Sequence, residues 1–312
     1  LMAGYWVFPY YEAQFLEPVL VIPLALGAML CLLDNAARPR TGCLAAAGLL
    51  LGLLAWARPN ILLFLPLAAL CVGWRAGRIP GGRWAALVAP AGLVLCAALA
   101  VLPVTLRNFM VSGELVPVTA GAGLNLHLGN NPLADGYTGI APDVKNWTTF
   151  DYPALVARLG REQGRSVTYS EASALYAAKA RAFIREDPGR FLRLILKKTL
   201  LFWGPLEISV DKVDECERAH SRVLRLGGLR FPHILALALL GFILYLGEGW
   251  RGAGGSAPDA REEPAGEATR AGVVLIAAFI LIYFASYLPF TITGRYRVPL
   301  IPFLLLFGAY GL

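Results

Sequence analysis

A series of long apolar runs, separated by short charged loops, constrains this chain more than any other sequence feature. The runs cover 14–33, 42–57, 61–74, 84–106, 231–247, 271–290 and the stretch from 298 onward. A helix needs about 20 residues to cross the hydrocarbon core of a bilayer, and most of the runs approach that length. The composition agrees, since 57% of the 312 residues are hydrophobic against roughly 45–50% in soluble domains. The sequence therefore predicts an all-α polytopic membrane protein.

The apolar runs divide the chain into three predicted regions. Residues 1–106 and 231–312 carry transmembrane helices, and residues 107–230 form a polar region long enough to need structure of its own. Residues 248–270 are rich in Gly, Ala, Pro and acids, and are predicted to be a disordered connector. Because the chain opens on the apolar segment Leu1-Met2, it is expected to be a fragment that lacks N-terminal spans.

Arginine placement predicts the orientation of the spans. The short loops 34–41 and 75–83 hold an excess of arginine, so both are expected to face the cytoplasm, together with the connector 248–270. The region 107–230 then lies outside. The turn Arg58-Pro59-Asn60, also outside, joins two short runs that form either tilted spans or a re-entrant hairpin, because proline interrupts helices.

Two helices are predicted within the polar region. Thr168 and Glu171 form a capping box that opens the first. The second, at 190–204, is amphipathic and is expected to lie in the membrane interface, with Lys197 and Lys198 facing lipid headgroups. The alternative is a membrane crossing, which would bury both lysines at high cost.

Arginines beside the spans are candidate phosphate ligands. Gly294-Arg295-Tyr296-Arg297 carries two guanidiniums two residues apart at the predicted outer mouth of the last span, and arginine forks match phosphate oxygens. The predicted donor phosphate-binding residues are Arg58, Arg295, Tyr296 and Arg297. Anchoring to lipid headgroups is the alternative role for each arginine.

The segment LNLHLGNN alternates apolar and polar residues as a short strand would, and it concentrates amides. Amides suit sugar hydroxyls because each offers donors and acceptors. For the histidine in this segment, a structural role is the alternative to a catalytic one. The predicted substrate-binding residues are Asn60, Arg107, Asn125, His127, Asn130, Asn131 and Glu207. Glu12 and Glu17, beside the first run, are candidates for an acid, a base or packed carboxylates.

Other classes of site are disfavoured. The net charge is +7, but the basic residues fall in loops between apolar runs, which argues for membrane lipids and against nucleic acid. The five cysteines include no C-x-x-C pair, so neither a zinc site nor a disulfide framework is expected. No cofactor is indicated, and a divalent metal requirement is left open. The sequon Asn146-Trp147-Thr148 is treated as a chance match.

Four segments in this order resemble one family: GLLLGLLAWARPN, LRNFMVSGELVPVTAGAGLNLHLGNN, KKTLLFWGPLEIS and GRYRVPLIPFLLL. They are similar to bacterial family-39-like glycosyltransferases of the GT-C fold, which are related to protein mannosyltransferases and aminoarabinose transferases. The resemblance implies a GT-C-like helix bundle in the bacterial inner membrane, with the polar region extracytoplasmic. It also implies a hexosyl- or pentosyltransferase that uses a polyprenyl-phosphate-linked sugar donor and a lipid, glycan or protein acceptor.

One departure from the family pattern affects the catalytic base. Such enzymes carry a catalytic aspartate in the outer loop after their first span, and no aspartate of this chain fills that place, since Asp34 is predicted to be cytoplasmic. The base is therefore unassigned and expected upstream. Two rival functions stay open: a transporter or flippase of lipid-linked sugars, which inverted repeats would favour, and a non-catalytic membrane scaffold.

Overall fold

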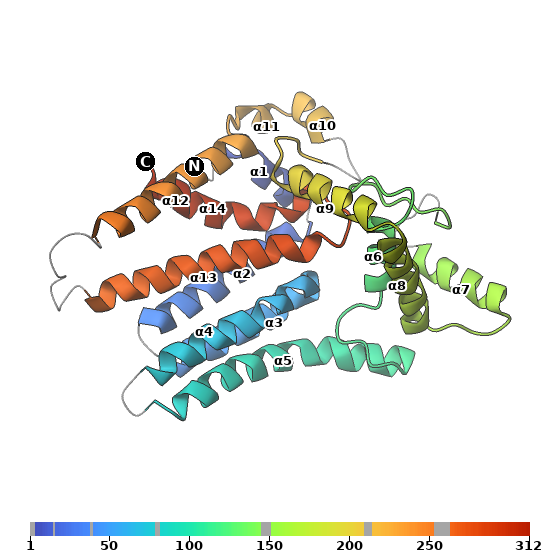
Figure 1. The fold of residues 1–312 in the computed structure, drawn as a ribbon, viewed down its shortest axis with the longest axis horizontal. Coiled ribbons are helices and arrows are strands. Elements are labelled where there is room, and N and C mark those ends of the chain that lie inside the picture. The colour runs from blue at the N-terminus through green and yellow to red at the C-terminus, as the bar shows by residue number, and fades with distance from the viewer. Residues whose placement is uncertain are drawn as a thin grey trace. The chain divides into compact units, whose positions relative to one another are not determined.

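The computed structural model describes residues 4–14, 16–37, 40–78, 82–144, 151–208, 214–252 and 263–312, and within these ranges it contains helices and no β-strand (Figure 1). The chain forms two compact units. Unit 1 comprises Leu1–Pro103, Asp214–Ala285 and Arg297–Leu312, and unit 2 comprises Val104–Val213 and Ser286–Tyr296. The sequon at Asn146 and the residues 253–262 of the connector lie outside the described residues.

Unit 1 is built from the apolar helices. Five described helices are long and apolar enough to cross a membrane, with windows at Pro18–Asn35, Pro59–Gly77, Ala85–Ser112, Phe231–Glu248 and Thr269–Tyr287. This confirms the helical membrane class. The elements are α1 (Val7–Ala13), α2 (Pro18–Ala37), α3 (Thr41–Ala57), η2 (Pro59–Leu63), α4 (Leu65–Gly77), α5 (Ala85–Ser112), α10 (Asp214–His220), α11 (Arg222–Leu226), α12 (Phe231–Gly252), α13 (Glu263–Tyr287), η5 (Val298–Leu300) and α14 (Ile301–Tyr310); α5 and α13 continue into unit 2.

The predicted break after α3 is present. The helix ends at Ala57, and Arg58 leaves the helical conformation before Pro59 starts the 3-10 turn η2. The residue before a proline avoids the helical region, because the proline ring clashes with its backbone. Arg58 is therefore held at a fixed point between α3 and α4.

The prediction that residues 248–270 are disordered is wrong at both ends of this segment. Helix α12 continues to Gly252 and α13 begins at Glu263, so residues 248–252 and 263–270 are helical. Extending an existing helix costs much less than nucleating a new one, and the long apolar helices supply the nucleus. The low apolar content of this stretch was therefore a poor guide to its backbone conformation.

Two glycines bring α3 and α5 into close contact. A Cβ atom added at Gly48 would lie 2.4 Å from the carbonyl oxygen of Leu93, and one added at Gly52 would lie 2.4 Å from that of Ala97. In a membrane, apolar side chains gain nothing by leaving lipid, so helices associate through close packing of small residues. The spacing of four residues places both glycines on one face of α3.

Unit 2 contains α6 (Ala122–Gly129), α7 (Tyr152–Gln163), α8 (Tyr169–Glu186), α9 (Pro188–Trp203) and η4 (Gly294–Tyr296). The predicted capping box of Thr168 and Glu171 is confirmed at the start of α8. The predicted strand in LNLHLGNN is wrong, because its first six residues, 124–129, lie in α6. Leu124 and Leu128 lie four residues apart on its buried face, in the same apolar core as Tyr176 of α8. An alternation of so few residues fits a strand and a helix equally well.

The contact of α3 with α5 yields a stability prediction. Gly48→Val should lower the free energy of unfolding by about 1–3 kcal/mol, because the added side chain overpacks a contact that has no room for one. Gly42→Val is the matched control on the same helix, since nothing lies within 4 Å of a Cβ atom there. Thermal unfolding in detergent measures both variants, and equal stabilities would show that the glycine contact is unimportant.

Candidate functional site

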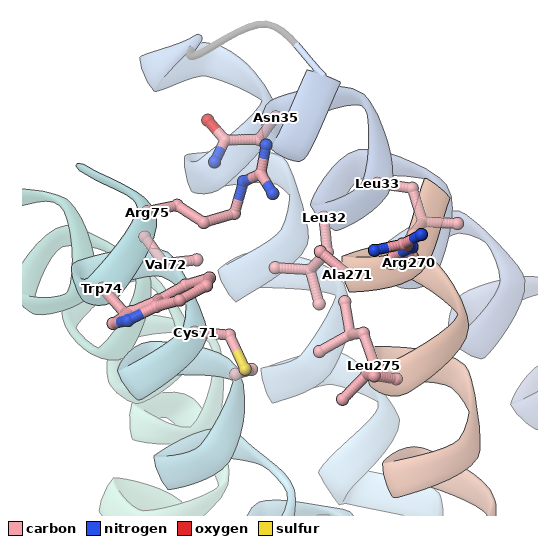
Figure 2. Close-up of a pocket in the computed structure, with 13 residues that line it drawn as sticks. Leu32, Leu33, Asn35, Cys71, Val72, Trp74, Arg75, Arg270, Ala271 and Leu275 are labelled. Atoms are coloured by element: carbon pink, nitrogen blue, oxygen red, sulfur yellow. The ribbon is translucent and has the colours of Figure 1, made fainter. Parts of the chain in front are cut away.

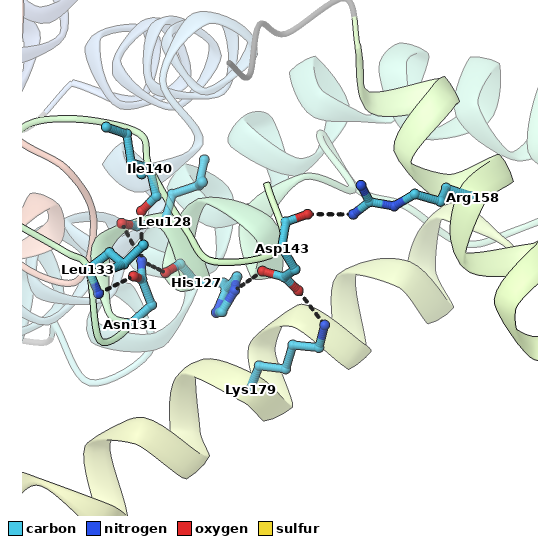
Figure 3. Close-up of polar contacts among 8 residues, drawn as sticks. All are labelled: His127, Leu128, Asn131, Leu133, Ile140, Asp143, Arg158 and Lys179. Carbon is cyan, nitrogen blue, oxygen red and sulfur yellow. Dashed lines mark hydrogen bonds and ion pairs between the residues drawn. The ribbon is translucent and has the colours of Figure 1, made fainter. Parts of the chain in front are cut away.

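A polar cluster in unit 2 is centred on Asp143 (Figure 3). His127 Nε2 of α6 lies 2.8 Å from Asp143 Oδ1, Lys179 of α8 pairs with Oδ2, and Arg158 of α7 donates to the Asp143 main-chain oxygen. One aspartate therefore connects three helices. No local sequence pattern indicates these partners, since Asp143 is 16 residues from His127 and 36 from Lys179.

The Asp143 carboxylate is held ionised by its neighbours. Burial of the Asp143 carboxyl raises its pKa, but the hydrogen bonds from Lys179 and His127 outweigh burial, so the pKa is lowered overall. His127 is only 5% exposed, and its ring lies 5.5 Å from that of Tyr176. The carboxylate orients the imidazole, as in many catalytic His–Asp pairs, yet here the imidazole is buried. The cluster is best suited to hold α6, α7 and α8 together.

The two asparagines after α6 are fully buried and bonded to the main chain. The amide nitrogen of Asn130 donates to the carbonyl oxygens of Leu126 at 2.8 Å and Pro289 at 2.6 Å. That of Asn131 donates to three carbonyl oxygens at 2.9–3.2 Å, and its Oδ1 accepts from the N–H of Leu133 (Figure 3). These bonds give both amides a structural role. Their contact with substrate stays a prediction.

Lys198 of α9 is fully buried among uncharged oxygens. Its Nζ donates to the carbonyl oxygens of Gly129 at 2.9 Å and Leu288 at 3.1 Å, and lies 3.4 Å from Asn130 Oδ1. Gly129 ends α6 and Leu288 follows α13, so the ammonium meets carbonyl groups that helix ends leave without partners. Burial lowers the pKa of Lys198 to about 8.

The prediction that Lys198 faces lipid headgroups is therefore wrong, whereas its neighbour Lys197 is exposed. Leu194, Lys198 and Phe202 are the buried residues of α9 and follow one another at four-residue spacing. One face of a helix repeats at this spacing. The pattern was visible in the sequence, but the adjacent lysine pair was interpreted as one basic surface.

The motif GRYR occupies η4 and the residue after it. The Tyr296 ring stacks on Tyr287 at 4.4 Å between centroids, and the Arg295 guanidinium lies 5.5 Å from the Tyr296 ring. Glu207 is close by, because a Cβ atom at Gly294 would lie 3.0 Å from its Oε2. The structure thus brings predicted residues from two distant segments of unit 2 together.

Three other predicted residues do not join these groups. Asn125 is exposed on α6, Arg107 is exposed on α5, and Asn60 is half-buried in η2. The described hydrogen bond of the Arg107 guanidinium goes to the neighbouring Asn108 at 3.4 Å. Their role in substrate binding stays a prediction.

In unit 1, two of the predicted phosphate ligands are partly or wholly buried. Arg58, at the end of α3, forms an ion pair with Glu17 at the start of α2, and the exposed fractions of the two side chains are 11% and 26%. Arg297 is 1% exposed, and its guanidinium lies 4.0 Å above the ring of Phe231. Both arginines are therefore fixed in direction by their neighbours.

A cavity of about 520 Å³ also lies in unit 1, and neither arginine is among the described residues that line it. Glu12 of α1 lines it, as do Pro18 of α2 and Val298 of η5. Glu17 immediately precedes Pro18, and the other arginine, at position 297, immediately precedes Val298. The cavity therefore has a carboxylate on its wall. Its wall residues adjoin, in the chain, one predicted phosphate ligand, Arg297, and the ion-pair partner of another, Arg58.

Among the described residues, no group of three or more His, Cys, Asp or Glu side chains is arranged to hold a metal ion. Comparison of the chain with protein-family models, curated proteins and solved structures gave no match. The functional argument therefore rests on the residues and their geometry.

The buried ammonium of Lys198 yields a second stability prediction. Lys198→Met should lower the free energy of unfolding by about 1–3 kcal/mol, because buried carbonyl oxygens lose their donor. Lys197→Met, at the exposed neighbouring position, should change it by less than about 0.5 kcal/mol. Thermal unfolding compares the two variants, and a larger loss for Lys197→Met would contradict the assignment.

A third prediction concerns pH. Because the pKa of Asp143 is lower in the folded protein than its ordinary value of 3.8, the carboxylate stabilises the fold above that pH, and this contribution is lost as the pH falls through the lowered pKa. Near neutral pH the melting temperature of Asp143→Asn should be lower than that of the parent. The difference between the two melting temperatures should shrink in acid. Glu186→Gln, at an exposed acid of α8, is the control and should show no such trend.

Proposed function

We propose that this protein is a membrane glycosyltransferase that moves a sugar from a polyprenyl-phosphate donor to an acceptor on the outer side of a bacterial inner membrane. The observation that carries the proposal is the unit 1 cavity, which has a carboxylate, Glu12, on its wall. Two further wall residues, Pro18 and Val298, adjoin in the chain Glu17, the ion-pair partner of Arg58, and Arg297. An acid and fixed cations beside apolar helices are what this chemistry requires.

Each part of the cavity has a chemical role in this proposal. Apolar wall residues such as Phe8, Val19 and Ile22 suit an isoprenoid chain. Arg58 and Arg297 stabilise the negative charge that develops on the departing lipid phosphate. Glu17 holds the Arg58 guanidinium in position, so the arginine side chain loses less conformational freedom when the donor binds.

The acceptor hydroxyl must lose a proton as the sugar is transferred. Glu12 is a carboxylate on the cavity wall and is exposed, so it is available to a substrate. The upstream carboxylate that the family resemblance implies is the competing base. Transfer with inversion at the sugar carbon would follow from either carboxylate, since the hydroxyl attacks opposite the departing phosphate.

Lysine variants test the proposal in the full-length protein. Arg58→Lys keeps the charge but loses the planar fork. Since a charge-assisted hydrogen bond contributes roughly 1.5–3 kcal/mol, transfer should fall about ten- to a hundredfold. Arg297→Lys should act in the same direction. The assay supplies polyprenyl-phosphate-linked hexoses and pentoses with membrane acceptors and measures released polyprenyl phosphate.

The matched control is Arg83→Lys, at an exposed arginine outside the cavity, and it should leave the rate unchanged. A melting curve for each variant separates loss of transfer from loss of fold. Parental rates in both cavity variants would overturn the phosphate assignment. Donor binding and movement across vesicle membranes, without release of polyprenyl phosphate, would instead establish a flippase.

A further inference from the structure

A second pocket, of about 260 Å³, lies in unit 1 between α2, α4 and α13 (Figure 2). Most of its wall is apolar and includes Leu32, Cys71 and Leu275. Two arginines complete it, Arg75 from α4 and Arg270 from α13. Figure 2 shows the Arg75 guanidinium near Asn35 and the Arg270 guanidinium near Leu33, on opposite sides of the pocket, with Cys71 and Leu275 further along its wall.

The polar end of this pocket coincides with the ends of three candidate spans. Asn35, on the pocket wall, is the last residue of the Pro18–Asn35 window, and Arg75 and Arg270 lie within two residues of the ends of their windows. In a bilayer, this level corresponds to the lipid headgroups, and the apolar end of the pocket to the first part of the acyl chains. Which compartment this end faces stays a prediction.

The chemistry of the wall specifies an anion with an apolar tail. Among the described residues that line the pocket there are two guanidiniums and no carboxylate. Arginine forks match phosphate oxygens. The side-chain amide of Asn35 adds hydrogen-bonding groups at the same end of the pocket. Trp74, which also lines the pocket, is the residue type that settles at the headgroup level.

We propose that this pocket binds an anionic phospholipid. The lipid phosphate lies between Arg75 and Arg270, and the start of one acyl chain runs along Leu32, Cys71 and Leu275. The pocket is smaller than a whole phospholipid, so the remaining chain lies on the outer surface of the helices. A free phosphate would use the arginines but not the apolar wall.

Native mass spectrometry of protein released from nanodiscs tests the site. With equal phosphatidylglycerol and phosphatidylcholine, the parent should retain phosphatidylglycerol preferentially. Arg75→Gln and Arg270→Gln should each weaken this preference about tenfold or more, because each removes a charge-assisted hydrogen bond to the lipid phosphate. Arg83→Gln removes the same charge outside the pocket and should preserve the preference. Equal retention in the parent and both pocket variants, or an equal loss in Arg83→Gln, would overturn the proposal.

A second measurement compares the parent protein with Trp74→Phe and does not depend on the folding of the arginine variants. The fluorescence of Trp74 is the difference in emission between the parent and Trp74→Phe. Brominated phosphatidylglycerol should quench this fluorescence more than brominated phosphatidylcholine does. Equal quenching contradicts the proposal, as does displacement of the lipid by millimolar inorganic phosphate. Both experiments measure lipid binding and not sugar transfer, so failure of this proposal can be distinguished from failure of the proposed function.

Discussion

Every polar group placed in an apolar environment needs a partner, and the structure of this chain depends on that requirement. In unit 1 the requirement selects helices, because a helix satisfies its own main-chain groups without water. Their association then depends on close approach rather than on escape from water, which explains the glycines at 48 and 52 where α3 meets α5.

The same requirement explains unit 2, where polar side chains meet main-chain groups that have left the helical pattern. Asn130 and Asn131 bind carbonyl oxygens around the end of α6, and Lys198 binds those at two helix ends. A sequence rich in amides is compatible with sugar binding, but it is equally suited to joining helix ends. In this chain the buried amides hold the fold together.

The two candidate sites of unit 1 differ in their charges. The larger cavity has Glu12 on its wall, and two further wall residues adjoin in the chain Arg297 and the ion-pair partner of Arg58. The smaller pocket has arginines and no carboxylate in its described lining. The first adjoins the beginning of α2 and the second its end, so they are separated along a helix of 20 residues. An acid beside cations suits group transfer, whereas cations with apolar neighbours suit retention of a lipid.

The sequence by itself determined the helical membrane class, the positions of the long helices, the turn at Arg58 and the capping box at Thr168, because each depends on residues that are close together in the chain. The four-residue repeat around Lys198 was equally local, although the adjacent lysine obscured it. Only the tertiary structure decided that Arg58 meets Glu17, that Asp143 joins His127 to Lys179, and that Arg75 and Arg270 share a pocket. These residues are far apart in the chain, and they meet because of how the helices pack, which no local pattern specifies.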